Sequence, residues 1–295
     1  MTVAFRLDGV FSVVPTVFRD DGSLDLEGTA AVARATCDAG VAGLTALGVM
    51  GEAAELSEDE RRAVLVSVTS VAGVPVVVGV SGDSIPQIAD RARDAAASGA
   101  TALMVGPARS IGLAGAVDAA ATAGLPIVIQ DYPLGSGVVM TTDEITAVAA
   151  AQPLVAGVKA EAPPTSGSIA ALRASQPRLG LVGGLGGLFL LDELRAGANG
   201  VMTGFALPDR LVSVVRTYPT DPSAAQRDWE WLLPLMRLEA FAPFSLVARK
   251  EVWRLRGVIG SSRCRRAGAR LDDRARDDIG QALGRVTGVA VGWLS

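Results

Sequence analysis

Short apolar runs recur along the chain, and stretches with the three-to-four-residue spacing of amphipathic helices lie between them. The runs are rich in Val, Leu and Ile and are bounded by Gly or Pro, which is typical of strands buried on both faces. The expected strands are residues 11–18, 43–49, 74–80, 101–107, 126–133, 155–160, 179–185 and 200–205. The expected helices are residues 25–39, 57–71, 85–98, 115–124, 142–151, 168–175 and 188–196.

This alternation predicts the fold class. Eight strand–helix repeats within roughly 210 residues favour an α/β protein built as a parallel (β/α)8 barrel, a TIM barrel. The main alternative is a doubly wound open sheet, but no GxGxxG motif follows the first strand. From about residue 221 the strand pattern ends while helical patterns continue. We therefore expect residues 1–220 to form the barrel and residues 221–295 to form a helical region packed on it.

Composition narrows the possible chemistry. The chain has 295 residues and no histidine, so Ser-His and Cys-His nucleophile pairs, His-ligated zinc and imidazole acid–base catalysis are excluded. Proton transfer must then fall to Asp, Glu, Tyr, Lys or a group of the substrate. A net charge of −4 without basic tracts argues against nucleic acid as the main partner.

Two further absences concern the compartment. No apolar run approaches the ~20 residues that span a bilayer, and the first residues show no basic-then-apolar signal pattern. Cys37 and Cys264 are far apart and form no CxxC pair, which predicts reduced thiols. We therefore expect a cytoplasmic protein with no membrane partner.

Only two of the 27 basic residues are lysines. Lys159 ends the apolar run 155–160, whereas Lys250 lies in the charged, helix-like stretch Arg249-Lys250-Glu251, where we expect a solvated surface role. Lysine, unlike arginine, can lose its proton and attack a carbonyl to form a Schiff base. Lys159 is therefore a candidate nucleophile, the alternative being a side chain that snorkels at a strand end.

In a barrel of this type the active site lies at the carboxyl ends of the strands. The segments expected there are residues 15–16, 48–52, 81–83, 106–109, 130–133, 159–161 and 183–187. Lys159 would then face a partly dry, concave site, where desolvation favours the neutral amine. This context favours the nucleophile over the snorkelling side chain.

Three landmarks lie at these strand ends: Gly48-Val49-Met50-Gly51-Glu52, Pro133 and Gly157-Val158-Lys159. With them the chain resembles the dihydrodipicolinate synthase/N-acetylneuraminate lyase family of class I aldolases over nearly its whole length. The resemblance implies that Lys159 forms a Schiff base with a 2-oxo acid, usually pyruvate. It also implies a homo-oligomer, a tetramer or dimer, with no metal and no organic cofactor.

The sequence departs from the family pattern at the site. Val49 and Met50 stand where the family has hydroxyl-bearing residues that bind the keto-acid carboxylate, so only the backbone N–H groups of that turn, which starts at Gly48, remain as donors. Gln130 stands where the family has its tyrosine acid–base. Arg109 and Gly135 replace a tyrosine and an arginine of the synthases. We therefore do not expect dihydrodipicolinate synthesis.

Two residues are candidates for the missing proton carrier. Glu161 is two residues beyond Lys159, so both side chains point the same way if the strand persists. The alternative is that Glu161 only pairs with Arg109 or another arginine. Tyr132 is the other candidate, with packing under its loop as the alternative, and Gln130 can orient a water or a substrate carbonyl.

The pocket is expected to be more apolar than in the synthases, which favours a bulkier or more hydrophobic acceptor or cleaved fragment, with Arg109 available to hold a carboxylate. Gly184, within the glycine cluster 183–187, is expected to approach the substrate with its backbone. Phosphate binding by this cluster is a separate possibility, because the loops after strands 7 and 8 often bind phosphate in barrels.

The leading hypothesis is a Schiff-base lyase, an aldolase or a dehydratase, that acts on a 2-oxo acid such as pyruvate or a pyruvate-derived adduct, with an aldehyde as the second substrate of an aldolase. One alternative is a non-catalytic or regulatory barrel that binds a keto acid without turnover. Another is a phosphosugar isomerase barrel with an acidic base, in which Lys159→Ala retains activity.

Overall fold

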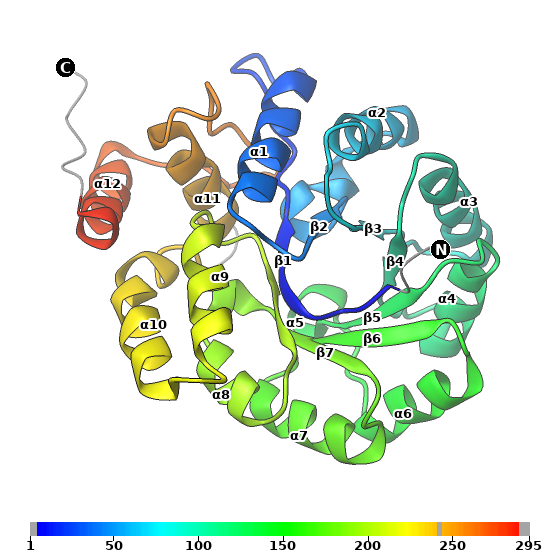
Figure 1. Ribbon diagram of the computed structural model, residues 1–295. Coiled ribbons are helices and arrows are strands. Elements are labelled where there is room, and N and C mark those ends of the chain that lie inside the picture. The colour runs from blue at the N-terminus through cyan, green and yellow to red at the C-terminus, as the bar shows by residue number, and fades with distance from the viewer. Residues whose placement is uncertain (1–4, 241–243, 289–295) are drawn as a thin grey trace.

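Eight parallel strands close into a barrel surrounded by helices, as Figure 1 shows for this computed structural model, which describes residues 5–240 and 244–288. The strands are β1 (Gly9–Val13), β2 (Gly43–Ala46), β3 (Val76–Gly79), β4 (Ala102–Val105), β5 (Ile127–Asp131), β6 (Val155–Ala160), β7 (Gly180–Gly183) and β8 (Gly200–Thr203). Each strand pairs in parallel with its neighbours in the chain, and β8 pairs with β1. The predicted TIM barrel is confirmed.

The outer layer consists of α1 (Leu26–Asp38), α2 (Glu58–Thr69), α3 (Ile85–Ala97), α4 (Gly112–Ala121), α6 (Thr142–Ala151), α7 (Thr165–Ser175), α8 (Leu190–Arg195) and α9 (Pro208–Thr217). A short helix, α5 (Pro133–Ser136), follows β5. The start of α2 is set by a capping box in which the Ser57 hydroxyl accepts from the Glu60 amide while the Glu60 carboxylate accepts from the Ser57 amide.

Except for β6, which matches its run 155–160, the strands are shorter than the apolar runs that predicted them. The run 11–18 contains the end of β1, but Val14, Val17 and Phe18 are buried in the loop that follows. Such loops are apolar because they are covered by other parts of the chain, so hydrophobicity alone does not mark where a strand ends. α5 and α9 were not predicted.

The strands separate two layers of core side chains, since successive residues of a strand point to opposite faces. Inside the barrel lie Leu7, Phe11, Val13, Val77, Ala102, Met104, Val128, Val182 and Met202. A larger layer packs between the strands and the helices. This double burial explains the continuous apolar runs in the sequence.

Three helices follow α9: α10 (Pro222–Met236), α11 (Phe244–Leu255) and α12 (Asp273–Thr287). α10 packs against α9, and α12 packs against both α10 and α11, so the three helices gather on one side of the barrel (Figure 1). Within residues 5–240 and 244–288, no helix is long and apolar enough to cross a membrane.

A buried ion pair ties this helical region to the barrel. Lys250 of α11 is fully buried, and its Nζ lies 2.5 Å from Oε1 of Glu52, in the turn after β2. The other oxygen, Oε2, accepts from the backbone amides of Arg265 and Arg266, both at 2.8 Å. Glu52 has a left-handed backbone (φ 51°), which is costly for a non-glycine residue, and these contacts hold it there.

The expected surface role of Lys250 is therefore wrong. Every residue from Ser245 to Trp253 in α11 is buried, including its charged residues. Lys250 is neutralised by Glu52, donates to the carbonyl of Arg263 at 2.9 Å and lies over the Phe18 ring. The sequence prediction failed because the partners that neutralise this charged stretch lie elsewhere along the chain and cannot be read from the stretch itself.

Lys250→Met should destabilise the protein strongly, because it leaves the Glu52 carboxylate buried without its counter-ion. A loss of about 3–5 kcal/mol is expected in urea-induced unfolding. Arg62→Met is the matched control, since Arg62 is half exposed and its pairs with Asp59 and Asp94 are surface pairs of small effect. Equal losses of unfolding free energy in the two variants would show that the buried Glu52–Lys250 pair contributes no more to stability than a surface pair.

Candidate active site

Lys159 and Glu161 face the same side at the end of β6. Lys159 Nζ lies 3.0 Å from Glu161 Oε2, and the two side chains are only 8% and 7% exposed. The two-residue spacing brings both side chains to the inner face at the carboxyl end of the barrel. The structure thus brings together an amine and a carboxylate at proton-transfer distance.

Glu161 is held in place by two further donors. Gln130 pairs with Lys159 in the β5–β6 register, and its Nε2 donates to Glu161 Oε2 at 3.1 Å. The backbone amide of Leu185, after β7, donates to Oε1 at 3.2 Å. The ion-pair partner of Glu161 is therefore Lys159 rather than Arg109 or another arginine of the described chain.

The glycines after β7 make room for two buried carboxyl groups. A Cβ on Gly184 would lie 2.1 Å from Glu161 Oε1, and one on Gly183 would lie 1.7 Å from Oε2 of Glu193 in α8. Gly184 thus lies beside Glu161, and the next residues, Leu185 and Gly186, reach the cavity. Two acids packed against this segment disfavour phosphate there.

Lys159 opens into a small chamber of about 70 Å³. Much of its wall is apolar, formed by Val13, Met50, Met104 and Met202. The chamber shares Val49, Gln130 and Tyr132 with an adjoining cleft of about 720 Å³. A small reacting group would fit beside the lysine while the remainder of a larger substrate lies in the cleft.

The turn after β2 offers backbone donors to the chamber. Val49 and Met50 start a short 3-10 turn (Val49–Gly51), and neither of their amides has a hydrogen-bond acceptor in the described part of the chain. Both residues line the chamber with Gly48. The turn thus lines the chamber with two unbonded backbone N–H groups and no side-chain hydroxyl.

Tyr132 combines a packing role with access to the cavity. Its ring lies over Gly135, where a Cβ would come within 2.2 Å of the ring. It also lines both the chamber and the cleft. Burial raises the pKa of Tyr132, the charge of Glu161 adds to this, and Arg249 and Arg266 oppose it. The phenol is thus within electrostatic reach of Glu161.

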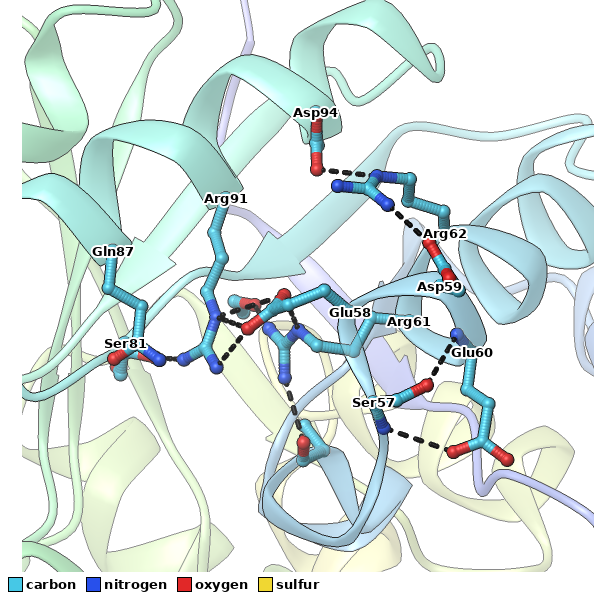
Figure 2. A network of polar contacts seen from close by, with 12 residues as sticks. Ser57, Glu58, Asp59, Glu60, Arg61, Arg62, Ser81, Gln87, Arg91 and Asp94 are labelled. Atoms are coloured by element: carbon cyan, nitrogen blue, oxygen red, sulfur yellow. Dashed lines mark hydrogen bonds and ion pairs between the residues drawn. The ribbon is translucent and has the colours of Figure 1, made fainter.

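A network of polar contacts between α2 and α3 forms one wall of the cleft (Figure 2). Arg91 and Arg61 both pair with Glu58, with N–O distances of 2.6 and 3.4 Å. Arg61 also donates to the carbonyls of Ala53 and Gly79, which ties the turn after β2 to the end of β3. Both arginines are therefore bonded to other residues of the cleft wall and stabilise it.

Two arginines lie at different distances from the chamber: Arg109 lies outside its lining, and Arg249 is part of it. Arg109 is exposed, donates to the Gly137 carbonyl at 3.0 Å, and lines the outer cleft but not the chamber. Arg249 of α11 was not predicted as a site residue, yet it lines the chamber with Lys159. In the sequence, the apolar residues that flank Arg249 are the only indication that this position is buried. In the structure α11 is buried on all sides.

Two buried carboxyl groups lie behind the chamber. Burial raises the pKa of Asp131 to about 6, and the charge of Glu161 adds to the effect. Burial raises the pKa of Glu193 to about 7, while Thr165 opposes the shift and Glu161 adds to it. Among residues 5–240 and 244–288, no group of three or more Asp, Glu or Cys could hold a metal ion.

Comparison with known proteins shows the family to which the chain belongs. The dihydrodipicolinate synthetase family matches residues 6–285. The chain is 30% identical to L-2-keto-3-deoxyarabonate dehydratase from Azospirillum brasilense, over 98% of this chain and 97% of that protein. The dihydrodipicolinate synthase structure from Rhodopseudomonas palustris is 34% identical, with a TM-score of 0.87 over 94% of this chain and 97% of that one.

A second similar structure agrees in fold alone. It is YagE, a prophage protein of the dihydrodipicolinic acid synthase family from E. coli K12, solved in complex with pyruvate. It is 23% identical, with a TM-score of 0.86 over 95% of this chain and 98% of that one.

A closed barrel with a buried lysine at the end of β6 defines the class of the protein, an aldolase-type barrel. The chain belongs to the dihydrodipicolinate synthetase family, and it is a lyase.

Glu193 makes stability depend on pH. Because its folded-state pKa is raised from 4.5 to about 7, the native state gains from keeping the proton, and this gain is lost as the pH rises from about 4.5 through about 7. Glu193→Gln should match the wild type below about pH 4 and exceed it near pH 8, by at most about 3 kcal/mol.

The measurement is the free energy of unfolding of both proteins at several pH values. Asp131 and Glu239 change stability in the same direction, so the difference between variant and wild type is the quantity to follow. Two parallel pH curves would contradict the role assigned to Glu193.

Proposed function

We propose that the protein is a Schiff-base lyase that acts on a 2-oxo acid, with Lys159 as the nucleophile. The observation that carries this proposal is the 3.0 Å contact between Lys159 Nζ and Glu161 Oε2 inside a small chamber with a mixed polar and apolar wall. Glu161 can take the proton that the ammonium must lose before it attacks the ketone. Glu161 then returns this proton to the hydroxyl of the carbinolamine, which leaves as water, so that the iminium forms and the Glu161 carboxylate is restored.

The iminium makes the C3–H bond acidic because the resulting carbanion is stabilised as an enamine. Glu161 is the carboxylate nearest the lysine and takes the C3 proton. The enamine then either attacks an aldehyde, which makes a C–C bond and an alkoxide, or expels the C4 oxygen, which is a dehydration. In both cases the proton that Glu161 took from C3 passes to that oxygen, so a hydroxyl group or a molecule of water results. Water finally releases the product and regenerates the amine.

The dehydration is supported by the similarity to L-2-keto-3-deoxyarabonate dehydratase over nearly the full length of both chains. A 2-keto-3-deoxy acid carries its ketone at C2, where the lysine attacks, and its hydrogens at C3. The outer cleft of about 720 Å³ has room for the carbon chain beyond C4. Gln130, where the family tyrosine is missing, would hold the Glu161 carboxylate in position rather than exchange protons.

Borohydride reduction in the presence of pyruvate should trap a covalent adduct on Lys159. Because the chain has only two lysines, peptide mass spectrometry assigns the adduct without ambiguity. The buried, ion-paired Lys250 is the internal control and should stay unmodified. The absence of an adduct on Lys159 with pyruvate and with 2-keto-3-deoxy acids would refute the proposal.

Glu161→Gln should separate imine formation from proton transfer. Water can accept the ammonium proton in the variant, so a borohydride-trapped adduct should still form at long reaction times, but exchange of the pyruvate C3 protons with D₂O, followed by NMR, should slow by about 10²–10⁴-fold. Asp131→Asn is the matched control, because Asp131 is also a buried carboxyl near this site but does not line the chamber. Exchange at the wild-type rate in Glu161→Gln would assign the proton transfer to another group.

A further inference from the structure

Arg249 brings a positive charge from the helical region into the barrel's reaction chamber. It precedes Lys250 in α11, and its side chain is 8% exposed. It lines the same chamber of about 70 Å³ as Lys159 and Glu161. A buried guanidinium is costly unless its charge is neutralised and its N–H groups are bonded, so its position calls for a partner.

Glu239 is the partner of one edge of this guanidinium. Arg249 Nε lies 3.0 Å from Glu239 Oε2, and Nη2 donates to the backbone carbonyl of Glu239 at 2.9 Å. Glu239 itself is fully buried. One edge of the guanidinium is thus fixed in place by a residue that lies outside the chamber lining.

The rest of the guanidinium has no hydrogen-bond partner among the residues that the structure describes. Nη1 has no hydrogen-bond acceptor within residues 5–240 and 244–288, and Nη2 makes only the one bond to Glu239. A guanidinium carries five N–H donors in a planar fork that matches a carboxylate. The remaining donors are therefore available to an anionic group in the chamber.

The side chain also borders the turn that presents free amides. A Cβ placed on Gly204 would be 3.6 Å from both Arg249 Cδ and Met50 Cβ, so Arg249 and the turn after β2 meet at one corner of the chamber. Further along, a Cβ on Gly186 would be 3.3 Å from Arg249 Nη2. The guanidinium thus lies between the turn after β2 and the turn after β7.

We propose that Arg249 binds the carboxylate of the 2-oxo acid, together with the backbone amides of Val49 and Met50. The proposal rests on the proposed function, which supplies the 2-oxo acid. Val49 and Met50 carry no hydroxyl, so the turn alone offers a carboxylate no side-chain donor. Arg249 adds a charge-assisted, forked donor at the same corner, in a chamber where little water competes.

The test compares pyruvate with its methyl ester, which has the same ketone but no carboxylate. The readout is the concentration that half-saturates borohydride trapping on Lys159. Wild type should prefer pyruvate, and Arg249→Met should weaken pyruvate by about 10- to 100-fold while leaving the ester unchanged. Arg249→Lys keeps the positive charge but lacks the forked donors. Its half-saturating pyruvate concentration should therefore lie between those of the wild type and Arg249→Met.

Arg249→Met leaves Glu239 buried without its partner, so the double variant Arg249→Met/Glu239→Gln is made alongside it to keep the fold. Arg254→Met is the matched control on the same helix, because Arg254 pairs with Glu251 away from the chamber. It should keep the wild-type preference for pyruvate.

Two outcomes would overturn the role of Arg249. The first is unchanged pyruvate trapping in Arg249→Met and the double variant, and the second is an equal loss for pyruvate and ester, which would indicate a structural effect. Wild-type protein that forms no adduct with either compound would instead refute the proposed function, and the carboxylate role of Arg249 with it.

Discussion

The buried ion pair between Glu52 and Lys250 holds together the two halves of the site. Glu52 belongs to the turn after β2, and Lys250 to a helix almost two hundred residues further along the chain. The same carboxylate also accepts two backbone amides from residues 265 and 266, so the loop before α12 is fixed as well. A desolvated pair of this kind is costly to break, which makes the position of α11 relative to the barrel well defined.

That position has a chemical consequence, because Lys250 and Arg249 are neighbours in α11. When Lys250 reaches Glu52, Arg249 is brought to the chamber that contains Lys159. The glutamate of the GxxGE landmark is therefore structural here, while the residues before it in the turn face the chamber. In this arrangement the barrel provides the lysine and carboxylate of the candidate site, and the helical region provides a further cation.

The strand pattern and the rarity of lysine were sufficient to predict the barrel and the position of Lys159. The placement of Glu161 on the same side as Lys159 followed from the two-residue repeat of a strand, and the register between β5 and β6 then explains why Gln130 contacts it. Arg249 and Lys250 could not be placed in this way, because their partners Glu239 and Glu52 are set by the tertiary fold. Arg109, which the sequence suggested could hold a carboxylate, lines the outer cleft and donates to the Gly137 carbonyl.

The most direct test of the account is a crystal structure of the enzyme reduced with borohydride in the presence of pyruvate. The account predicts a covalent bond between Lys159 Nζ and C2 of the ligand, with the Glu161 carboxylate within hydrogen-bonding distance of the reacting atoms. It also predicts that the ligand carboxylate lies between Arg249 and the amides of Val49 and Met50. An unmodified Lys159, or an adduct whose carboxylate points into the outer cleft, would contradict it.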